Sequence, residues 1–211
     1  MLPFSEPQLS PLPLSEFPPL KPLLLQQVLQ QPHHVTEMVE AVAKEFGRID
    51  ILINNAGITK DAQFYKMTDE QFDAVINVNL RGNFLMTKAV VPYMMEQKYG
   101  KIVHCASVSA YNGNFGQSNY AASKAAIMGM TRVQAKELGK YGINVNAIAP
   151  GSIMTDMYAA VPEEVKQAKL AKIPLRRYGD PRETAQLYAF LASDESSYVT
   201  AQTITIDGGF N

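Results

Sequence analysis

The sequence predicts an α/β fold, an open doubly wound parallel sheet flanked by helices. Short and almost wholly apolar runs, of the kind that form strands buried on both faces, alternate with longer stretches in which apolar residues recur at helical spacing. Each apolar run ends in a polar or proline- and glycine-containing loop. In open parallel sheets ligands bind beyond the carboxyl ends of the strands, so these loops are where a site is expected.

Length and composition fit a single well-buried domain. The chain has 211 residues, of which 46% are hydrophobic and 18% charged, and a formal net charge of −1 excludes attraction to nucleic acid by overall charge. One cysteine, Cys105, excludes an intrachain disulfide, and three histidines without Cys/His ligand spacing argue against a metal site. No apolar run approaches the ~20 residues that span a bilayer. We therefore expect a cytoplasmic protein without a membrane span, with an organelle as the alternative location.

Glycine and proline are segregated along the chain. All 13 glycines lie at or after Gly47, whereas 8 of the 13 prolines lie within the first 32 residues. Closely spaced prolines prevent both a helix and a central strand, so residues 1–34 are expected to form an extended or disordered arm. The leucines of this arm leave open a partner-binding or surface-adhering segment. Residues 35–211 form the predicted domain.

The domain begins with a predicted helix that Gly47 ends and a buried strand at residues 49–53. The apolar residues that give the helix its i, i+3, i+4, i+7 spacing are Val35, Met38, Val39, Val42 and Phe46. Thr68 and Gln71 form a capping-box pattern that opens a helical stretch reaching Lys98, with Asn79 inside it. Further predicted elements are a strand at 101–106, a helix at 118–140, a strand at 143–149, a helix capped by Asp180 with Pro181 in its first turn, and a strand at 203–206.

Tyr120 and Lys124 stand four residues apart on the predicted 118–140 helix, so their side chains share one face with Cβ atoms ~6 Å apart. A free tyrosine, with a pKa of about 10, is a poor acid or base near neutrality, and a neighbouring ammonium favours its phenolate. Lys124 is therefore expected to lower the pKa of Tyr120. Ser107 directly follows the 101–106 strand, where its hydroxyl would donate a hydrogen bond to a carbonyl oxygen.

By itself a Tyr-x-x-x-Lys pattern is weak, because a packed ring and a solvated amine commonly share a helix. Here the pattern belongs to an ordered set of motifs. Asn54-Asn-Ala-Gly57 follows a strand, and Asn79 lies in the next helix. Ser107 precedes Tyr120-Ala-Ala-Ser-Lys124, and Pro150-Gly-Ser-Ile-Met-Thr155 follows another strand. Together these motifs resemble the short-chain dehydrogenase/reductase family over about residues 35–211.

The resemblance implies an oxidoreductase that transfers a hydride between NADP(H) or NAD(H) and a carbonyl or alcohol. It implies that Tyr120 is the proton donor, that Ser107 orients and polarises the carbonyl, and that Lys124 holds the nicotinamide ribose and lowers the Tyr120 pKa. Asn79 would position a water in a proton relay. The implied cofactor-binding residues are Tyr120 and Lys124, with Asn55, Ala56 and Gly57 on the adenosine side and Pro150, Gly151, Ile153 and Thr155 toward the nicotinamide.

Within the family, residues 54–61, 116–124, 173–175 and 206–209 look most like bacterial-type 3-oxoacyl-acyl-carrier-protein reductases of fatty-acid synthesis. Another alcohol or sugar dehydrogenase of the family is the alternative, since such enzymes share much of the sequence in these stretches. The substrate would be a small or acyl-carrier-bound carbonyl compound. A basic docking rim for an acidic carrier, or else ordinary solvated lysines, is expected at Lys98, Lys101, Lys136 and Lys140. The resemblance also implies a homotetramer in which the two long helices pair across a dimer interface.

The sequence departs from the family in one respect. Full members carry a T-G-x-x-x-G-x-G turn whose backbone approaches the cofactor pyrophosphate at a helix N-terminus, and here no glycine precedes Gly47. We therefore expect an N-terminally truncated Rossmann fold with an uncovered sheet edge beside the 49–53 strand. Two interpretations stay open: a truncated enzyme sequence, or a catalytically silent interaction subunit that has lost dinucleotide binding.

Overall fold

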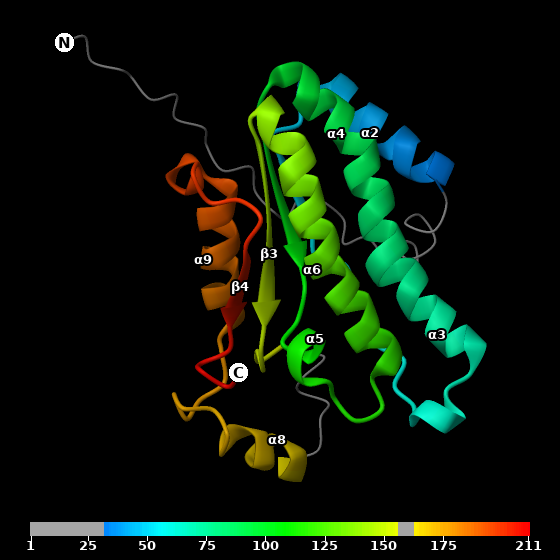
Figure 1. Ribbon diagram of the computed structural model, residues 1–211, viewed down its shortest axis with the longest axis vertical. Helices are drawn as coiled ribbons and strands as arrows, with labels where there is room; N and C mark the ends of the chain where they lie inside the picture. Colours follow the sequence, from blue (N-terminus) through cyan, green and yellow to red (C-terminus); the bar gives the residue numbers. More distant parts are fainter. Residues whose placement is uncertain (1–31, 156–162) are drawn as a thin grey trace, which may run out of the picture.

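The computed structural model describes residues 32–155 and 163–211, which are built around a parallel four-stranded sheet (Figure 1). Its strands lie in chain order and are β1 Ile51–Asn54, β2 Gly100–Cys105, β3 Ile143–Pro150 and β4 Thr203–Ile206. In register, Leu52 pairs with Ile102 and Ile148 pairs with Ile204. The predicted α/β class and all four predicted strands are confirmed.

Helices cover both faces of this sheet (Figure 1). On one face lie α2 Pro32–Phe46, α4 Asn83–Gln97 and α6 Ser118–Leu138, and on the other lies α9 Pro181–Ala192. The shorter elements are η2 Phe64–Lys66, α3 Asp69–Val75, the π-helical η3 Ile76–Gly82, α5 Ser109–Asn112, η4 Gly139–Tyr141, α8 Glu163–Leu170 and η5 Asp194–Ser196. Of the helices in the described ranges, none is both long and apolar enough to cross a membrane.

Alternate side chains of the central strands enter cores on opposite faces of the sheet. The core under α4 and α6 includes Leu52, Val90, Met94, Ile102 and Val145. The core under α9 consists of Val103, Ile148, Tyr188 and Leu191. Burial on both faces explains why β2 and β3 read as almost continuous apolar runs.

β1 lies at the edge of the described sheet, and only one of its faces is covered. Leu52 is buried, whereas Ile51 and Ile53 are 47% and 44% exposed. The prediction that this strand is buried on both faces was wrong, because α9 packs over β2 and β3 and not over β1. The uncovered edge expected beside residues 49–53 is present within the described part of the chain.

Local signals place three of the helix ends as predicted. Gly47 has a φ of 75° and its N–H donates to the Ala43 carbonyl, which ends α2. Thr68 and Gln71 form the capping box of α3, and Asp180 caps α9 with Pro181 in the first turn. α2 begins at Pro32 instead of Val35, since the exposed residues of its first turn carry no periodic apolar signal. The arm predicted over residues 1–34 otherwise lies outside the described residues.

Candidate active site

Parallel strands bring the predicted site residues to one edge of the sheet. β1 leads into Asn55, Ala56 and Gly57, β2 leads into Ser107, and β3 leads into Gly151. Because the strands are parallel, these loops open at the same end. The first turns of α6 lie beside α5 at this end, toward which the arrows of β2 and β3 point in Figure 1. Tyr120 and Lys124 belong to those first turns.

Ser107, Tyr120 and Lys124 form one cluster. Lys124 Nζ lies 5.6 Å from the centroid of the Tyr120 ring and donates a hydrogen bond of 2.7 Å to the Cys105 carbonyl. The Ser107 hydroxyl interacts with the Tyr120 hydroxyl and accepts a hydrogen bond of 3.2 Å from the Ser109 N–H. Both Ser107 and Lys124 are buried. The three predicted groups therefore lie close together.

Burial determines how this cluster holds protons. It raises the pKa of Tyr120 to about 12, with Cys105 adding to the rise and the Ser107 hydrogen bond opposing it. Burial also lowers the pKa of Lys124. The expectation that Lys124 lowers the Tyr120 pKa was wrong for this arrangement, because the ammonium is directed at the Cys105 carbonyl and is itself desolvated. Tyr120 stays protonated near neutrality, which is the form that a proton donor requires.

Asn79 braces the loop that follows β1. It is 1% exposed and lies in the π-helical η3, a wide turn of the kind often found at functional sites. Its Oδ1 accepts a hydrogen bond of 2.8 Å from the Ile58 N–H, and its Nδ2 donates to the Ile58 carbonyl at 3.1 Å and to Ser123 Oγ at 3.2 Å. The side chain thus ties the loop to α6, while its role toward a relay water stays a prediction.

The two glycines of the site differ in how closely their neighbours approach. A Cβ at Gly57 would make ordinary van der Waals contacts, 3.4 Å from Asn79 Oδ1 and 3.5 Å from Lys124 Nζ, so the loop backbone lies beside the lysine without requiring glycine. A Cβ at Gly151 would lie 2.5 Å from Asp207 Cβ, closer than two carbon atoms can approach. Gly151 is therefore explained by packing against the turn after β4, and its contact with a cofactor stays a prediction.

Known proteins share this chain's sequence over most of its length. The family described as Enoyl-(Acyl carrier protein) reductase matches residues 22–211. The chain is 56% identical over 175 residues to 3-oxoacyl-[acyl-carrier-protein] reductase FabG of Thermotoga maritima, which is 83% of this chain and 71% of the relative. The protein of the same name from Staphylococcus epidermidis is 45% identical, over 83% of this chain and 72% of the relative. That from Vibrio cholerae is 43% identical, over 84% of this chain and 73% of the relative. The chain belongs to the short-chain dehydrogenase/reductase family.

Members of this family are oxidoreductases that use a nicotinamide cofactor, and the residues on the nicotinamide side fit one. An ammonium has three N–H donors, and Lys124 directs one of them to the Cys105 carbonyl, which leaves donors for ribose hydroxyls. Gly57 leaves room beside that ammonium. On the pyrophosphate side the fit is lacking, because residues 32–155 and 163–211 contain no glycine-rich turn between a strand and a helix, and Gly47 ends α2.

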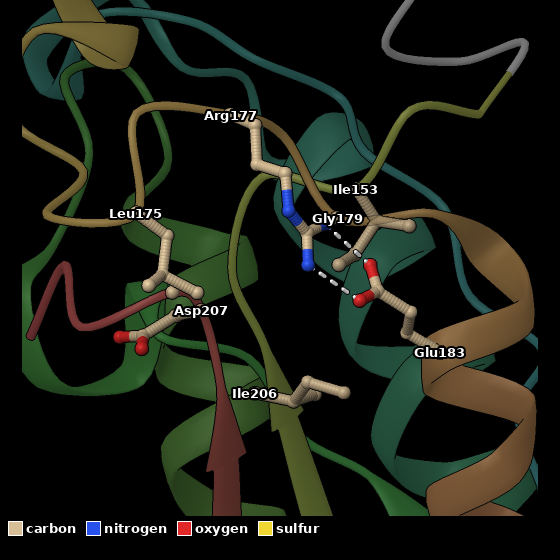
Figure 2. Close-up of a pocket in the computed structure, with 8 residues that line it drawn as sticks. Ile153, Leu175, Arg177, Gly179, Glu183, Ile206 and Asp207 are labelled. Atoms are coloured by element: carbon tan, nitrogen blue, oxygen red, sulfur yellow. Dashed lines mark hydrogen bonds and ion pairs between the residues drawn. The ribbon is translucent and has the colours of Figure 1, made fainter.

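In this short-chain dehydrogenase/reductase the loop after β3 borders a partly open hollow (Figure 2). Ile153 forms a bridge with Gly179 there, and the apolar side chains of Leu175 and Ile206 also line the hollow. Figure 2 shows a bidentate ion pair at its side, where an Arg177–Glu183 pair is held by hydrogen bonds of 2.7 and 2.8 Å. Such an exposed pair contributes little to stability. The predicted contact of Ile153 with a nicotinamide stays a prediction.

Pro150 and Thr155, the other predicted residues of this loop, are placed by backbone hydrogen bonds. The Pro150 carbonyl accepts from the Val108 N–H at 3.1 Å, which ties the end of β3 to the loop after Ser107. The Thr155 N–H donates to the Ile153 carbonyl at 2.9 Å. Both residues therefore belong to the same edge of the sheet as Tyr120, and their cofactor contacts stay predictions.

The basic rim predicted for a carrier protein lies at the wrong end of the sheet. Lys98 and Lys101 flank the start of β2, and Lys136 and Lys140 shortly precede β3, so all four lie toward the amino ends of the strands. Lys101 is moreover 2% exposed and its Nζ donates to Asn144 Oδ1 at 2.9 Å. This placement favours the alternative of ordinary solvated lysines for Lys98, Lys136 and Lys140, which are exposed and lie away from Tyr120.

The sequence did not indicate a role for Tyr188. This residue of α9 donates a hydrogen bond of 3.2 Å from its hydroxyl to Asn55 Oδ1, across a separation of 133 residues. Cys105, predicted as a small core residue, is half-buried, and its thiol is a neighbour of the Tyr188 hydroxyl. The sequence signal that could have indicated this role is a tyrosine on the buried face of α9, because a buried tyrosine hydroxyl needs a hydrogen-bond partner.

Replacing Asn79 by alanine is expected to lower the free energy of unfolding by about 2–3 kcal/mol, because two backbone groups of Ile58 lose their partner in a part-buried place. Urea unfolding measures this loss. The matched control is Ser123→Ala, which removes one Asn79 hydrogen bond and the bond from Ser123 Oγ to the Tyr120 carbonyl, leaves both Ile58 groups paired, and should cost about 1 kcal/mol. Equal losses in the two variants would show that Asn79 does not brace the loop.

Proposed function

We propose that this chain is a cytoplasmic reductase that converts the 3-oxo group of an acyl thioester on acyl carrier protein to a 3-hydroxy group in fatty-acid synthesis. The observation that carries the proposal is the Ser107, Tyr120 and Lys124 cluster at the carboxyl edge of the sheet. It occurs in a chain 56% identical to a protein named 3-oxoacyl-[acyl-carrier-protein] reductase. An alcohol or sugar dehydrogenase would use the same cluster on a different substrate.

The cluster can supply every proton and hydrogen bond that carbonyl reduction needs. A bound reduced nicotinamide supplies the hydride to the carbonyl carbon. Tyr120 then gives its hydroxyl proton to the carbonyl oxygen, which becomes the alcohol, and Ser107 donates a hydrogen bond to that oxygen. The hydrogen bond from Ser107 stabilises the phenolate left on Tyr120, and Lys124 holds the ribose of the nucleotide. In the proposal Asn79 positions the water through which Tyr120 regains its proton.

Titration of the 211-residue chain with NADPH and NADH tests this function. Binding of either nucleotide and its oxidation by a 3-oxobutanoyl thioester, followed by the absorbance of the reduced nicotinamide, is the expected result. Oxidation of the nucleotide by a sugar or simple ketone but not by the thioester would favour the alternative substrate class. A folded chain that binds neither nucleotide would overturn catalysis by this chain.

A second candidate function is assembly without catalysis, and the lack of a glycine-rich turn among the described residues favours it. In this case the chain joins a full-length relative through α4 and α6. The test is co-purification of the tagged chain with a co-expressed 3-oxoacyl-acyl-carrier-protein reductase. A stable monomer in the presence of that enzyme would exclude this function.

We also propose that copies of the chain associate as a homotetramer. The outer face of α6, together with α4, forms the interface between copies. Small or apolar residues are exposed at i, i+3, i+4, i+7 and i+11 on this face, and they are Ala122, Ala125, Ala126, Gly129 and Val133. Small side chains allow two helices to approach closely, and exposed apolar stripes of this kind mark protein interfaces.

Gly129→Arg should dissociate the assembly, because a long charged side chain would stand in the middle of the α6 stripe. Sedimentation velocity is expected to show a monomer where the unmodified chain sediments as a larger species. Gln167→Arg on the exposed side of α8 adds the same charge elsewhere and should leave the mass unchanged. An unmodified chain that already sediments as a monomer would contradict the proposed assembly.

A further inference from the structure

A hydrogen bond between distant parts of the chain joins α9 to the loop that follows β1. The Tyr188 hydroxyl donates to Asn55 Oδ1 at 3.2 Å. The Tyr188 ring is 9% exposed and packs in the core under α9 with Val103, Ile148 and Leu191. The core therefore fixes the ring, and the fixed ring holds its hydroxyl at the loop.

This hydrogen bond decides which atoms of the Asn55 amide are available to a ligand. A primary amide has one oxygen acceptor and one NH2 donor group. Because Tyr188 engages the oxygen, the NH2 group points away from Tyr188, and Asn55 as a whole is exposed. The amide therefore offers donors, which match acceptor oxygens such as those of a ribose or a phosphate.

The Tyr188 hydroxyl is suited to remain a hydrogen-bond donor. Burial raises its pKa far above the usual value for tyrosine, and the neighbouring Cys105 and Tyr120 add to the rise. The hydroxyl thus keeps its proton across the whole working range of pH. Nothing in this arrangement requires Tyr188 to exchange a proton with substrate.

We propose that Tyr188 is a positioning residue for the dinucleotide: through its hydroxyl, α9 holds the Asn55 amide with its donors toward the adenosine side of the cofactor. The inference rests on the proposed reductase function. It assigns to the C-terminal helix a share in cofactor affinity and none in hydride or proton transfer.

Tyr188→Phe tests this assignment because it removes the hydroxyl and keeps the ring in the core. We expect the KM for NADPH, or for NADH if that is the nucleotide used, to rise about 3- to 10-fold, the effect of one hydrogen bond, while kcat changes less than about twofold. Tyr99→Phe is the matched control, since it loses a tyrosine hydrogen bond of 2.9 Å to Asp194 next to the amino end of β2. Its KM and kcat should equal those of the unmodified chain.

A double-mutant cycle separates action through Asn55 from a general effect of α9. If Tyr188 acts through Asn55, Tyr188→Phe raises the KM for the nucleotide no further in a chain that already carries Asn55→Ala. Additive increases in KM, or a fall in kcat with an unchanged KM, would overturn the proposal.

Hydrogen–deuterium exchange of the ligand-free chain gives a readout that does not depend on activity. The backbone amides of residues 55–57 should exchange faster in Tyr188→Phe than in the unmodified chain and in Tyr99→Phe. Unchanged exchange would show that Tyr188 does not hold the loop. A chain that binds neither NADPH nor NADH would overturn the reductase function, and the exchange experiment would still decide whether Tyr188 holds Asn55.

Discussion

Replacing Tyr120 by phenylalanine is expected to lower the rate of carbonyl reduction by about 10²- to 10⁴-fold, the usual contribution of a positioned proton donor. The substitution removes one oxygen atom and leaves Lys124, the Cys105 carbonyl and Ser107 in place. The KM for the nucleotide should therefore change little. Steady-state kinetics with NADPH or NADH and a 3-oxobutanoyl thioester measure both quantities.

Tyr198→Phe is the control for this experiment, because Tyr198 is fully exposed and its loss should affect neither rate nor stability. Circular dichroism and urea unfolding establish that the Tyr120→Phe chain is folded. A folded Tyr120→Phe chain with more than about a tenth of the original turnover would remove Tyr120 from the role of proton donor.

A second large effect is expected on stability in acid, through His104. This residue is fully buried on β2. Its Nε2 hydrogen-bonds Gln134 Oε1 at 2.8 Å, and its Nδ1 accepts from Asn54 Nδ2 at 3.2 Å. If Nδ1 were protonated, its N–H would face the Nδ2 donor of Asn54, so that two hydrogen-bond donors would lie opposite each other. Burial lowers the pKa of His104 to about 4, against the opposing effect of the Gln134 hydrogen bond.

The sign of the effect follows from proton counting. Between pH 6.5 and about 4 the unfolded chain carries a proton on His104 that the folded chain does not, so the free energy of unfolding falls as the pH falls through this range. At roughly 1.4 kcal/mol for each pH unit, the full loss is about 3 kcal/mol. Above pH 6.5 His104 contributes no pH dependence.

Urea unfolding at a series of pH values measures this loss. His104→Gln is neutral at every pH, so its free energy of unfolding should lack the extra fall between pH 6.5 and 4. Parallel curves for the two chains over that range would mean that His104 is not the group responsible.

Most of the fold was predictable because its signals are local. The capping box at Thr68, the glycine that ends α2 and the apolar runs of β2 and β3 each depend on a few neighbouring residues, and each element formed where expected. The pairing of Tyr120 with Lys124 was equally accessible, since helical spacing alone puts them on one face.

What sequence did not predict depends on contacts between distant segments. The uncovered face of β1 depends on where α9 packs, and an apolar run such as residues 49–53 does not reveal which faces are covered. The π-helical turn at Asn79 departs from regular α-helical spacing, and no single residue in the sequence indicates it. The raised pKa of Tyr120 reflects burial by the whole fold, which the spacing of Tyr120 and Lys124 along the helix does not show.

The order of the strands has a consequence for synthesis of the chain. Because β1, β2, β3 and β4 lie side by side in chain order, each strand leaves the ribosome when its partner has already been made. The sheet can therefore grow outward by one strand and one crossover at a time, and no strand has to be inserted between two finished neighbours. The last step adds β4 to β3, so a nascent chain that ends before Thr203 exposes the edge of β3 in addition to that of β1.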